Sequence, residues 1–186
     1  MWQDYLVLNP EAQRVVDALL AEGESIVNDH IALRTFNVGV VALDECAKSF
    51  LSMGYEEKKS YFFETKKLRA KHYEHKADPS IPKIFISELL VDEFSTEFQD
   101  IVNSLVSHIC ADQVQRSNFF FSGRPWNVSL SQHETLLGES DYGAWVAAIG
   151  YRPNHFTVSI NNLKKYSDIH RPVSYTHLRA HETSGY

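Results

Sequence analysis

Two segments far apart in the chain alternate polar and apolar side chains with a period of two, and this pattern limits the possible folds more than any other feature. In the first, residues 28–36 read NDHIALRTF, so His30 and Arg34 share one face of a predicted strand. In the second, residues 151–163 read YRPNHFTVSINNL, and His155 begins the alternation. Each strand therefore has an apolar face for a core and a polar face that carries a histidine. Because polar strand faces usually meet water, the first segment alone favours a solvated His/Arg face.

The end of the chain has a different origin in our interpretation. Residues 173–183 read VSYTHLRAHET, which is the translation of one frame of a common transposase sequencing adapter. We therefore interpret residues 172–186 as a translated adapter scar, and residues 1–171 as the N-terminal part of a single domain of a longer protein. His177 and His181 have the i, i+4 spacing of zinc ligands on a helix, but within the scar they are assigned no function.

Composition excludes several functional classes. Hydrophobic residues make up 44% of the chain, which suits a packed core. The formal net charge of −6 argues against a nucleic-acid partner. No signal peptide or apolar run of about 18 residues is found, so we expect no membrane partner and a cytoplasmic location. Cys46 and Cys110 are predicted to be small buried hydrophobic residues in a reducing compartment.

Helical and strand patterns alternate along the chain. One helix is predicted to begin at Pro10, with Asn9 as its cap, and another to follow Ser95. Further helices are predicted at residues 43–53, 130–137 and 141–149. Further strands are predicted at residues 61–64, 70–75 and 83–89. This order indicates an α+β fold with a mixed or antiparallel sheet flanked by helices.

The two histidines suggest a metal site. If both strands project their histidines into one concavity, His30 and His155 would offer two neutral imidazoles to iron, zinc, copper or nickel. A carboxylate as third ligand would complete a facial triad with open positions for oxygen and substrate. Two histidines without a third ligand are a weak signal, so the solvated face stays open at this point.

The segments NDHIALRTF, IFISEL (residues 84–89) and YGAWVAAIGYRPNHFTVSINNL together resemble the 2-oxoadipate dioxygenase/decarboxylase family. The resemblance covers essentially all of residues 1–171, and the motifs DHIALRT and GYRPNHFTV are specific. It implies a fold related to the vicinal oxygen chelate metalloenzymes, incomplete in this chain. It also implies that residues 1–171 are part of a catalytic domain.

The resemblance assigns roles to three residues. The histidines of the two motifs bind Fe(II) in the family, and the arginine four residues after the first histidine contacts substrate. Matched here, His30 and His155 are the metal ligands, and Arg34 is the substrate-binding and catalytic residue. The family's third ligand is a glutamate well downstream. This sequence leaves the family pattern after about Ile169, so we expect the glutamate to be absent and the chain alone to be inactive.

The family's chemistry fits the spacing of these residues. A 2-oxo acid can chelate a metal through its keto oxygen and 1-carboxylate, while O2 takes a remaining position. Arg34 lies about 13 Å from His30 along an extended strand, where its planar fork could hold a distal carboxylate. The resemblance implies an Fe(II) enzyme of lysine catabolism that converts 2-oxoadipate, or a similar 2-oxo dicarboxylic acid, with O2 to 2-hydroxyglutarate and CO2. No organic cofactor is expected.

Two other classes of function remain open. A zinc-dependent hydrolase or lyase would use His30 and His155 to hold a Lewis acid that activates water. A non-catalytic module would keep Arg34 to bind an organic acid.

Several other polar and aromatic residues have more ordinary interpretations. His72 and His75 fit a solvated hairpin better than a ligand pair. Glu88 could line the cavity or support a ligand histidine, or it could be a paired carboxylate at a strand edge. Trp126 and Trp145 are predicted to anchor the core.

Overall fold

A five-stranded sheet organises the chain, with its strands in the order β2-β3-β4-β1-β5. The computed structural model describes residues 2–164. The strands are β1 (Asn28–Phe36), β2 (Tyr55–Phe63), β3 (Leu68–His75), β4 (Lys83–Leu89) and β5 (His155–Val158). β1 runs parallel to β4 and antiparallel to β5, and the other neighbours are antiparallel. The sheet is therefore mixed, and the predicted α+β fold is confirmed.

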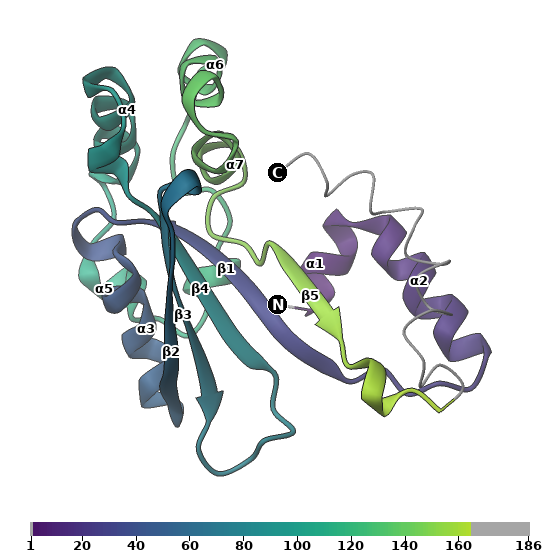
Figure 1. The fold of residues 1–186 in the computed structure, drawn as a ribbon. Helices are drawn as coiled ribbons and strands as arrows, with labels where there is room; N and C mark the ends of the chain where they lie inside the picture. The colour runs from purple at the N-terminus through teal and green to yellow at the C-terminus, as the bar shows by residue number, and fades with distance from the viewer. Residues whose placement is uncertain (1, 165–186) are drawn as a thin grey trace.

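Seven helices accompany the sheet within residues 2–164. They are α1 (Trp2–Leu8), α2 (Pro10–Ala21), α3 (Leu43–Ser52), α4 (Thr96–Val106), α5 (Ala111–Val114), α6 (Leu130–Glu139) and α7 (Asp141–Ile149). Figure 1 shows α3 and α5 along one face of the sheet, α1 and α2 beside β5, and α4, α6 and α7 at the end where β1 and β4 finish. None of these helices has the length and apolar character needed to cross a membrane.

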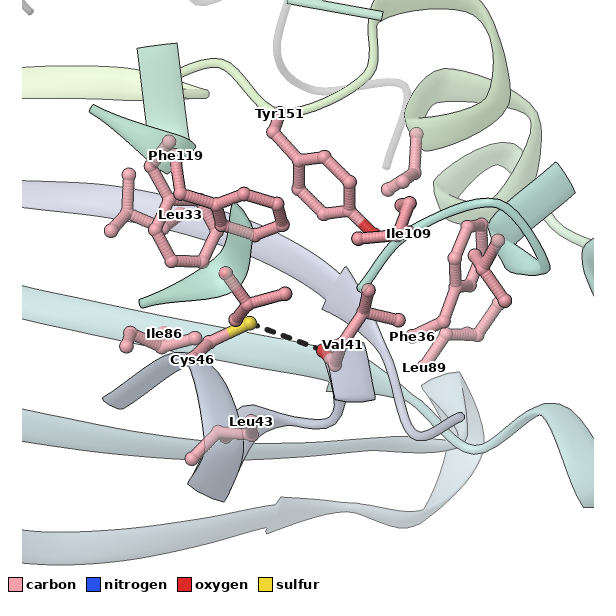
Figure 2. Close-up of a cluster of buried hydrophobic side chains, with 14 of the residues drawn as sticks. Leu33, Phe36, Val41, Leu43, Cys46, Ile86, Leu89, Ile109, Phe119 and Tyr151 are labelled. Carbon is pink, nitrogen blue, oxygen red and sulfur yellow. Dashed lines mark hydrogen bonds between the residues drawn. The ribbon is translucent and has the colours of Figure 1, made fainter. Parts of the chain in front are cut away.

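The main core lies between the sheet and the helices on the α3 side (Figure 2). Leu33 of β1 and Ile86 of β4 are fully buried there, because they occupy the strand face opposite His30. Cys46 of α3 is also buried, and its thiol donates a hydrogen bond to the Val41 carbonyl at 3.2 Å. Burial raises the pKa of the Cys46 thiol, so it stays protonated. The prediction of a small buried hydrophobic residue is confirmed for Cys46.

Some local predictions were wrong. Cys110 is exposed, because it begins the short helix α5 at the surface. Asn9 precedes α2 but makes no side-chain cap, and its side-chain amide instead donates to the Tyr5 carbonyl in α1. The helix α1 itself was not predicted. β2 begins at Tyr55, six residues earlier than predicted, and its mostly exposed side chains carry little periodic signal. Residues 172–186, which we interpret as the adapter scar, lie outside the described residues.

Glu88 is a buried, paired carboxylate on the α3 side of the sheet. Its side chain is 1% exposed. One oxygen accepts the Leu43 N–H at 2.7 Å, at the start of α3, and the other accepts the Arg69 Nε–H at 2.6 Å. Glu88 pairs with Thr35 across β1 and β4, so it lies on the face opposite Arg34. It therefore joins α3 to β3 and β4, and it does not support a ligand histidine.

We expect Glu88→Gln to lower the free energy of unfolding by roughly 2–3 kcal/mol, the scale of a hydrogen bond to a charged group. The amide cannot accept both hydrogen bonds with its two terminal atoms, so either Leu43 or Arg69 loses its acceptor. Urea unfolding followed by circular dichroism measures the change. Asp44→Asn is the matched control, because Asp44 also pairs with Arg69 but is about half exposed, and it should cost under about 1 kcal/mol. Equal losses in the two variants would contradict the assignment.

Candidate metal and substrate site

The candidate site lies on the face of β1 opposite the main core. Alternation along β1 gives His30 and Arg34 the same face, as predicted. β5 pairs antiparallel with the first half of β1 and places His155 opposite Ala32. The rings of His30 and His155 consequently lie close together, with centroids 5.7 Å apart and planes at 77°. The structure thus brings the two histidines together, while their role as metal ligands stays a prediction.

Neighbouring oxygen atoms hold the ring of His30. Its Nδ1 is 2.8 Å from Asp29 Oδ2 and 2.8 Å from Thr157 Oγ1. The Thr157 hydroxyl also accepts the backbone N–H of His30 at 3.1 Å. When Nδ1 carries the proton and donates it to Asp29, Nε2 keeps the lone pair that a metal needs. Thr157 thus fixes the main chain and the ring of His30 from the strand that carries His155.

His155 is oriented in a similar way. Its Nδ1 lies 2.8 Å from the amide oxygen of Asn154, which can only accept, so Nδ1 carries the proton in this contact. The backbone N–H of Asn154 donates to the Ala32 carbonyl at 2.8 Å, which attaches this residue to β1. Both histidines are therefore arranged so that Nε2 is the nitrogen able to bind a metal.

The environment keeps His155 neutral. Although the residue is exposed overall, its pKa is lowered to about 4. Loss of water around the ring is the largest cause, followed by electrostatic interactions with His30 and Arg34. Metals bind imidazole in its neutral form, so at neutral pH the ring has the required protonation state.

Arg34 is not the solvated residue that β1 alone would suggest. It is half-buried, and its guanidinium carbon lies 4.8 Å from the ring centroids of both Tyr142 and Trp145, on α7. Trp145 is half-buried and packs against the main core, so it anchors the core only in part. Trp126 is buried and donates its indole N–H to the Ala147 carbonyl at 2.8 Å, which confirms its prediction.

Among residues 2–164, no group of three His, Cys, Asp or Glu side chains is placed to hold a metal ion. The family's third ligand is a glutamate that we expect to be absent from this chain, and the described residues do not test that expectation. The donor chemistry of His30 and His155 fits iron, but the described residues supply two ligands and not a complete triad.

Sequence reasoning missed several residues that shape the site. His72 lies in the same cross-strand row as Ala32, on the site face, and its Nδ1 is 3.0 Å from the Tyr61 hydroxyl. The side chain of His72 is 20% exposed, so it is less solvated than predicted. The sequence gives only a weak indication of the roles of Asp29, Asn154 and Thr157, namely that each lies within two positions of a motif histidine. Tyr142 has no such signal.

Known proteins resemble this chain along most of its length. The sequence matches, over residues 6–171, the family described as 2-oxoadipate dioxygenase/decarboxylase. The chain belongs to this family. A curated relative from Arabidopsis thaliana, the chloroplastic 2-oxoadipate dioxygenase/decarboxylase, is 33% identical over an alignment of 178 residues that covers 87% of this chain and 47% of the relative. The chain thus spans about half the length of the curated relatives that it matches.

Two solved structures are similar to almost all of this chain. A protein from Shewanella frigidimarina NCIMB 400, described as a hydrolase, is 48% identical, with a TM-score of 0.89 and coverages of 96% of this chain and 69% of that chain. The hydroxyglutarate synthase from Oryza sativa, in complex with 2-oxoadipate, is 30% identical, with a TM-score of 0.86 and coverages of 95% and 61%.

A more distant likeness concerns the fold alone. A structure from Ralstonia eutropha JMP134, ascribed to the glyoxalase superfamily, has a TM-score of 0.68 at 23% identity, with coverages of 91% and 61%. The predicted vicinal-oxygen-chelate type of fold is therefore confirmed.

We expect His155 to titrate with a pKa near 4 in the presence of a chelator. Because the unfolded chain takes up this proton near pH 6.5, acid between these two values favours unfolding. Arg34→Gln should raise the pKa of His155 only in part, since loss of water is the larger cause. NMR of the imidazole nitrogens measures both values, and Lys67→Gln, directly after the 3-10 turn that follows β2, is the control that should change neither. An ordinary pKa in the unmodified protein would contradict the description of the site.

Proposed function

We propose that this chain forms part of a non-haem Fe(II) dioxygenase/decarboxylase that converts 2-oxoadipate, or a similar 2-oxo dicarboxylic acid, with O2 to 2-hydroxyglutarate and CO2. The observation that carries the proposal is the pair of imidazoles 5.7 Å apart, each with Nδ1 held by a neighbouring oxygen, on the strand face that also carries Arg34. Family membership and the 2-oxoadipate complex of the rice relative support the choice of substrate.

The proposed reaction balances without a further co-reactant. A six-carbon 2-oxo diacid and O2 contain the same atoms as the five-carbon 2-hydroxy diacid and CO2. The carbon–carbon bond to the 1-carboxylate breaks, and the substrate itself supplies the electrons that reduce dioxygen. When bound, Fe(II) supplies the electron-transfer chemistry that allows dioxygen to react with an organic acid.

The protein's own residues bind and orient the reactants. His30 and His155 would hold iron through Nε2, since their Nδ1 atoms are engaged with Asp29, Thr157 and Asn154. Arg34 would bind the distal carboxylate through charge-assisted hydrogen bonds. Its position four residues from His30 separates the reacting end of the substrate from the end that is recognised. Since the described residues contain two of the three ligands, we also infer that they alone do not complete an active iron site.

We expect His30→Ala and His155→Ala each to abolish iron binding and O2 consumption, since each removes one of the two described nitrogen ligands. The test uses protein expressed from the complete gene, with iron analysis and an oxygen electrode in the presence of 2-oxoadipate. His133→Ala, on α6, is the matched control and should retain both properties. Iron binding that persists in either site variant would refute the ligand assignment. A protein that binds zinc and consumes no O2 would instead be a hydrolase or lyase.

We expect Arg34→Lys to weaken the binding of 2-oxoadipate by roughly 1.5–3 kcal/mol, the scale of a charged hydrogen bond. Lysine keeps the charge but loses the planar pair of donors that matches a carboxylate. Calorimetric titration of the iron-loaded protein measures the affinity. Arg14→Lys, at an exposed position of α2, is the control and should bind as the unmodified protein does. Unchanged affinity in Arg34→Lys would show that Arg34 does not hold the substrate.

A further inference from the structure

Arg34 is held by two aromatic side chains from a single turn of α7. Its guanidinium carbon is 4.8 Å from the ring centroid of Tyr142 and 4.8 Å from that of Trp145, three residues later. Residues three apart on a helix lie on the same side. The two rings and Arg34 therefore form one unit, which we call the aromatic clamp.

The clamp restricts the guanidinium without using its hydrogen-bond donors. A cation–π contact acts on the positive charge through the face of the ring, whereas the N–H groups of arginine point outward in the guanidinium plane. A free arginine side chain loses much of its rotamer freedom on binding a ligand, and one that is already held loses less. The clamp thus favours binding of a carboxylate in a fixed place.

Tyr142 is the fixed part of the clamp. Its hydroxyl donates to the Ser87 carbonyl at 2.7 Å and accepts the Thr35 N–H at 3.1 Å. Thr35 follows Arg34 on β1, and Ser87 is the residue opposite Arg34 on β4. Burial raises the pKa of the Tyr142 hydroxyl, so it keeps the proton that it donates. The ring is therefore anchored to the two strands at the level of the residue that it contacts.

The packing of α7 also fixes the distance of the clamp from the sheet. A Cβ atom at Gly143 would lie 2.6 Å from Phe98 Cζ and 3.3 Å from Leu89 Cδ2. Phe98 is fully buried and stacks on Phe94 at 4.5 Å, so it cannot easily move aside. Glycine costs about 1 kcal/mol relative to alanine inside a helix, but here it lets α7 approach closely.

Trp145 is the replaceable part of the clamp. It is half-buried, and it also lines a pocket of about 440 Å³ together with Asp4, Arg152 and Asn154. A smaller side chain at this position would open space toward that pocket, and it would not break a hydrogen bond of Tyr142. Substitution of Trp145 therefore tests the clamp with little change to the core.

We propose that Tyr142 and Trp145 are positioning residues that hold Arg34 as a rigid fork, and that this clamp makes the site selective for 2-oxo acids with a second, distal carboxylate. The inference rests on the proposed function, because it takes Arg34 as the group that binds the distal end. It predicts that loss of the clamp weakens recognition of that carboxylate and spares binding of the 2-oxo end.

The test compares two ligands of equal chain length. Calorimetry on iron-loaded protein from the complete gene gives the Kd for 2-oxoadipate and for 2-oxohexanoate, which lacks the distal carboxylate. The preference for the diacid is the Kd for 2-oxohexanoate divided by the Kd for 2-oxoadipate. We expect this ratio to fall about five- to tenfold in Trp145→Leu, the range of a partly desolvated cation–π contact. Trp145→Phe should restore most of the ratio, because it returns an aromatic face. Tyr142→Phe should lower the ratio as well, because it keeps the ring but removes its anchor.

The controls separate the clamp from a general loss of structure. Lys67→Gln removes the cation of another cation–π pair, in which Lys67 Nζ is 4.2 Å from the Phe94 ring centroid, and it should leave the ratio unchanged. If Trp145→Leu fails to fold, as judged by thermal unfolding, Trp145→Met replaces it in the same comparison. A ratio that is unchanged in the folded Trp145 variant, while the unmodified protein still prefers the diacid, would overturn the clamp alone. An unmodified protein that does not bind 2-oxoadipate would overturn the proposed function and this inference with it.

Discussion

Successive side chains of a strand point to opposite faces, and in β1 this rule determines which groups can meet. One face of the strand supplies Leu33 to the main core, while the other carries His30 and Arg34. A shift of the strand by one residue would exchange the two faces, so the register of β1 has to be specified strongly. Two hydroxyl groups contribute to this. Thr157 binds the backbone of His30 from β5, and Tyr142 binds that of Thr35 from α7.

The same alternation explains which parts of the site could be predicted from the sequence. The even spacing of His30 and Arg34 in an apolar strand identified the site face of β1, and the family motifs identified β5 as the second strand of the site. The bounds of β4 and α7 also agree with the prediction. The contacts of Arg34 with Tyr142 and Trp145 could not be predicted, because a single sequence does not say which side of a helix meets which strand. β5 ends at Val158, although the alternation continues beyond it, because a 3-10 turn follows at Ile160–Asn162.

The charged side chains on the two faces of the sheet have different surroundings. On the α3 side, the buried carboxylate of Glu88 is balanced by Arg69. On the site face, the half-buried cation Arg34 contributes to the lowered pKa of His155, after the loss of water and the interaction with His30. The formal net charge of the whole chain is −6. A half-buried arginine can attract a small anion locally even where the whole chain carries a net negative charge.

The close approach of α7 to Phe98 has a consequence for how this protein can evolve. Gly143 lies on neither of the two strands that carry the histidines, yet its lack of a side chain sets how near α7 can come to Phe98 and Leu89. A methyl group at this position would displace the helix, and the displacement would reach the guanidinium through Tyr142. Selection for a different acid could therefore act on helix spacing, and variants that first look like packing defects would change substrate preference.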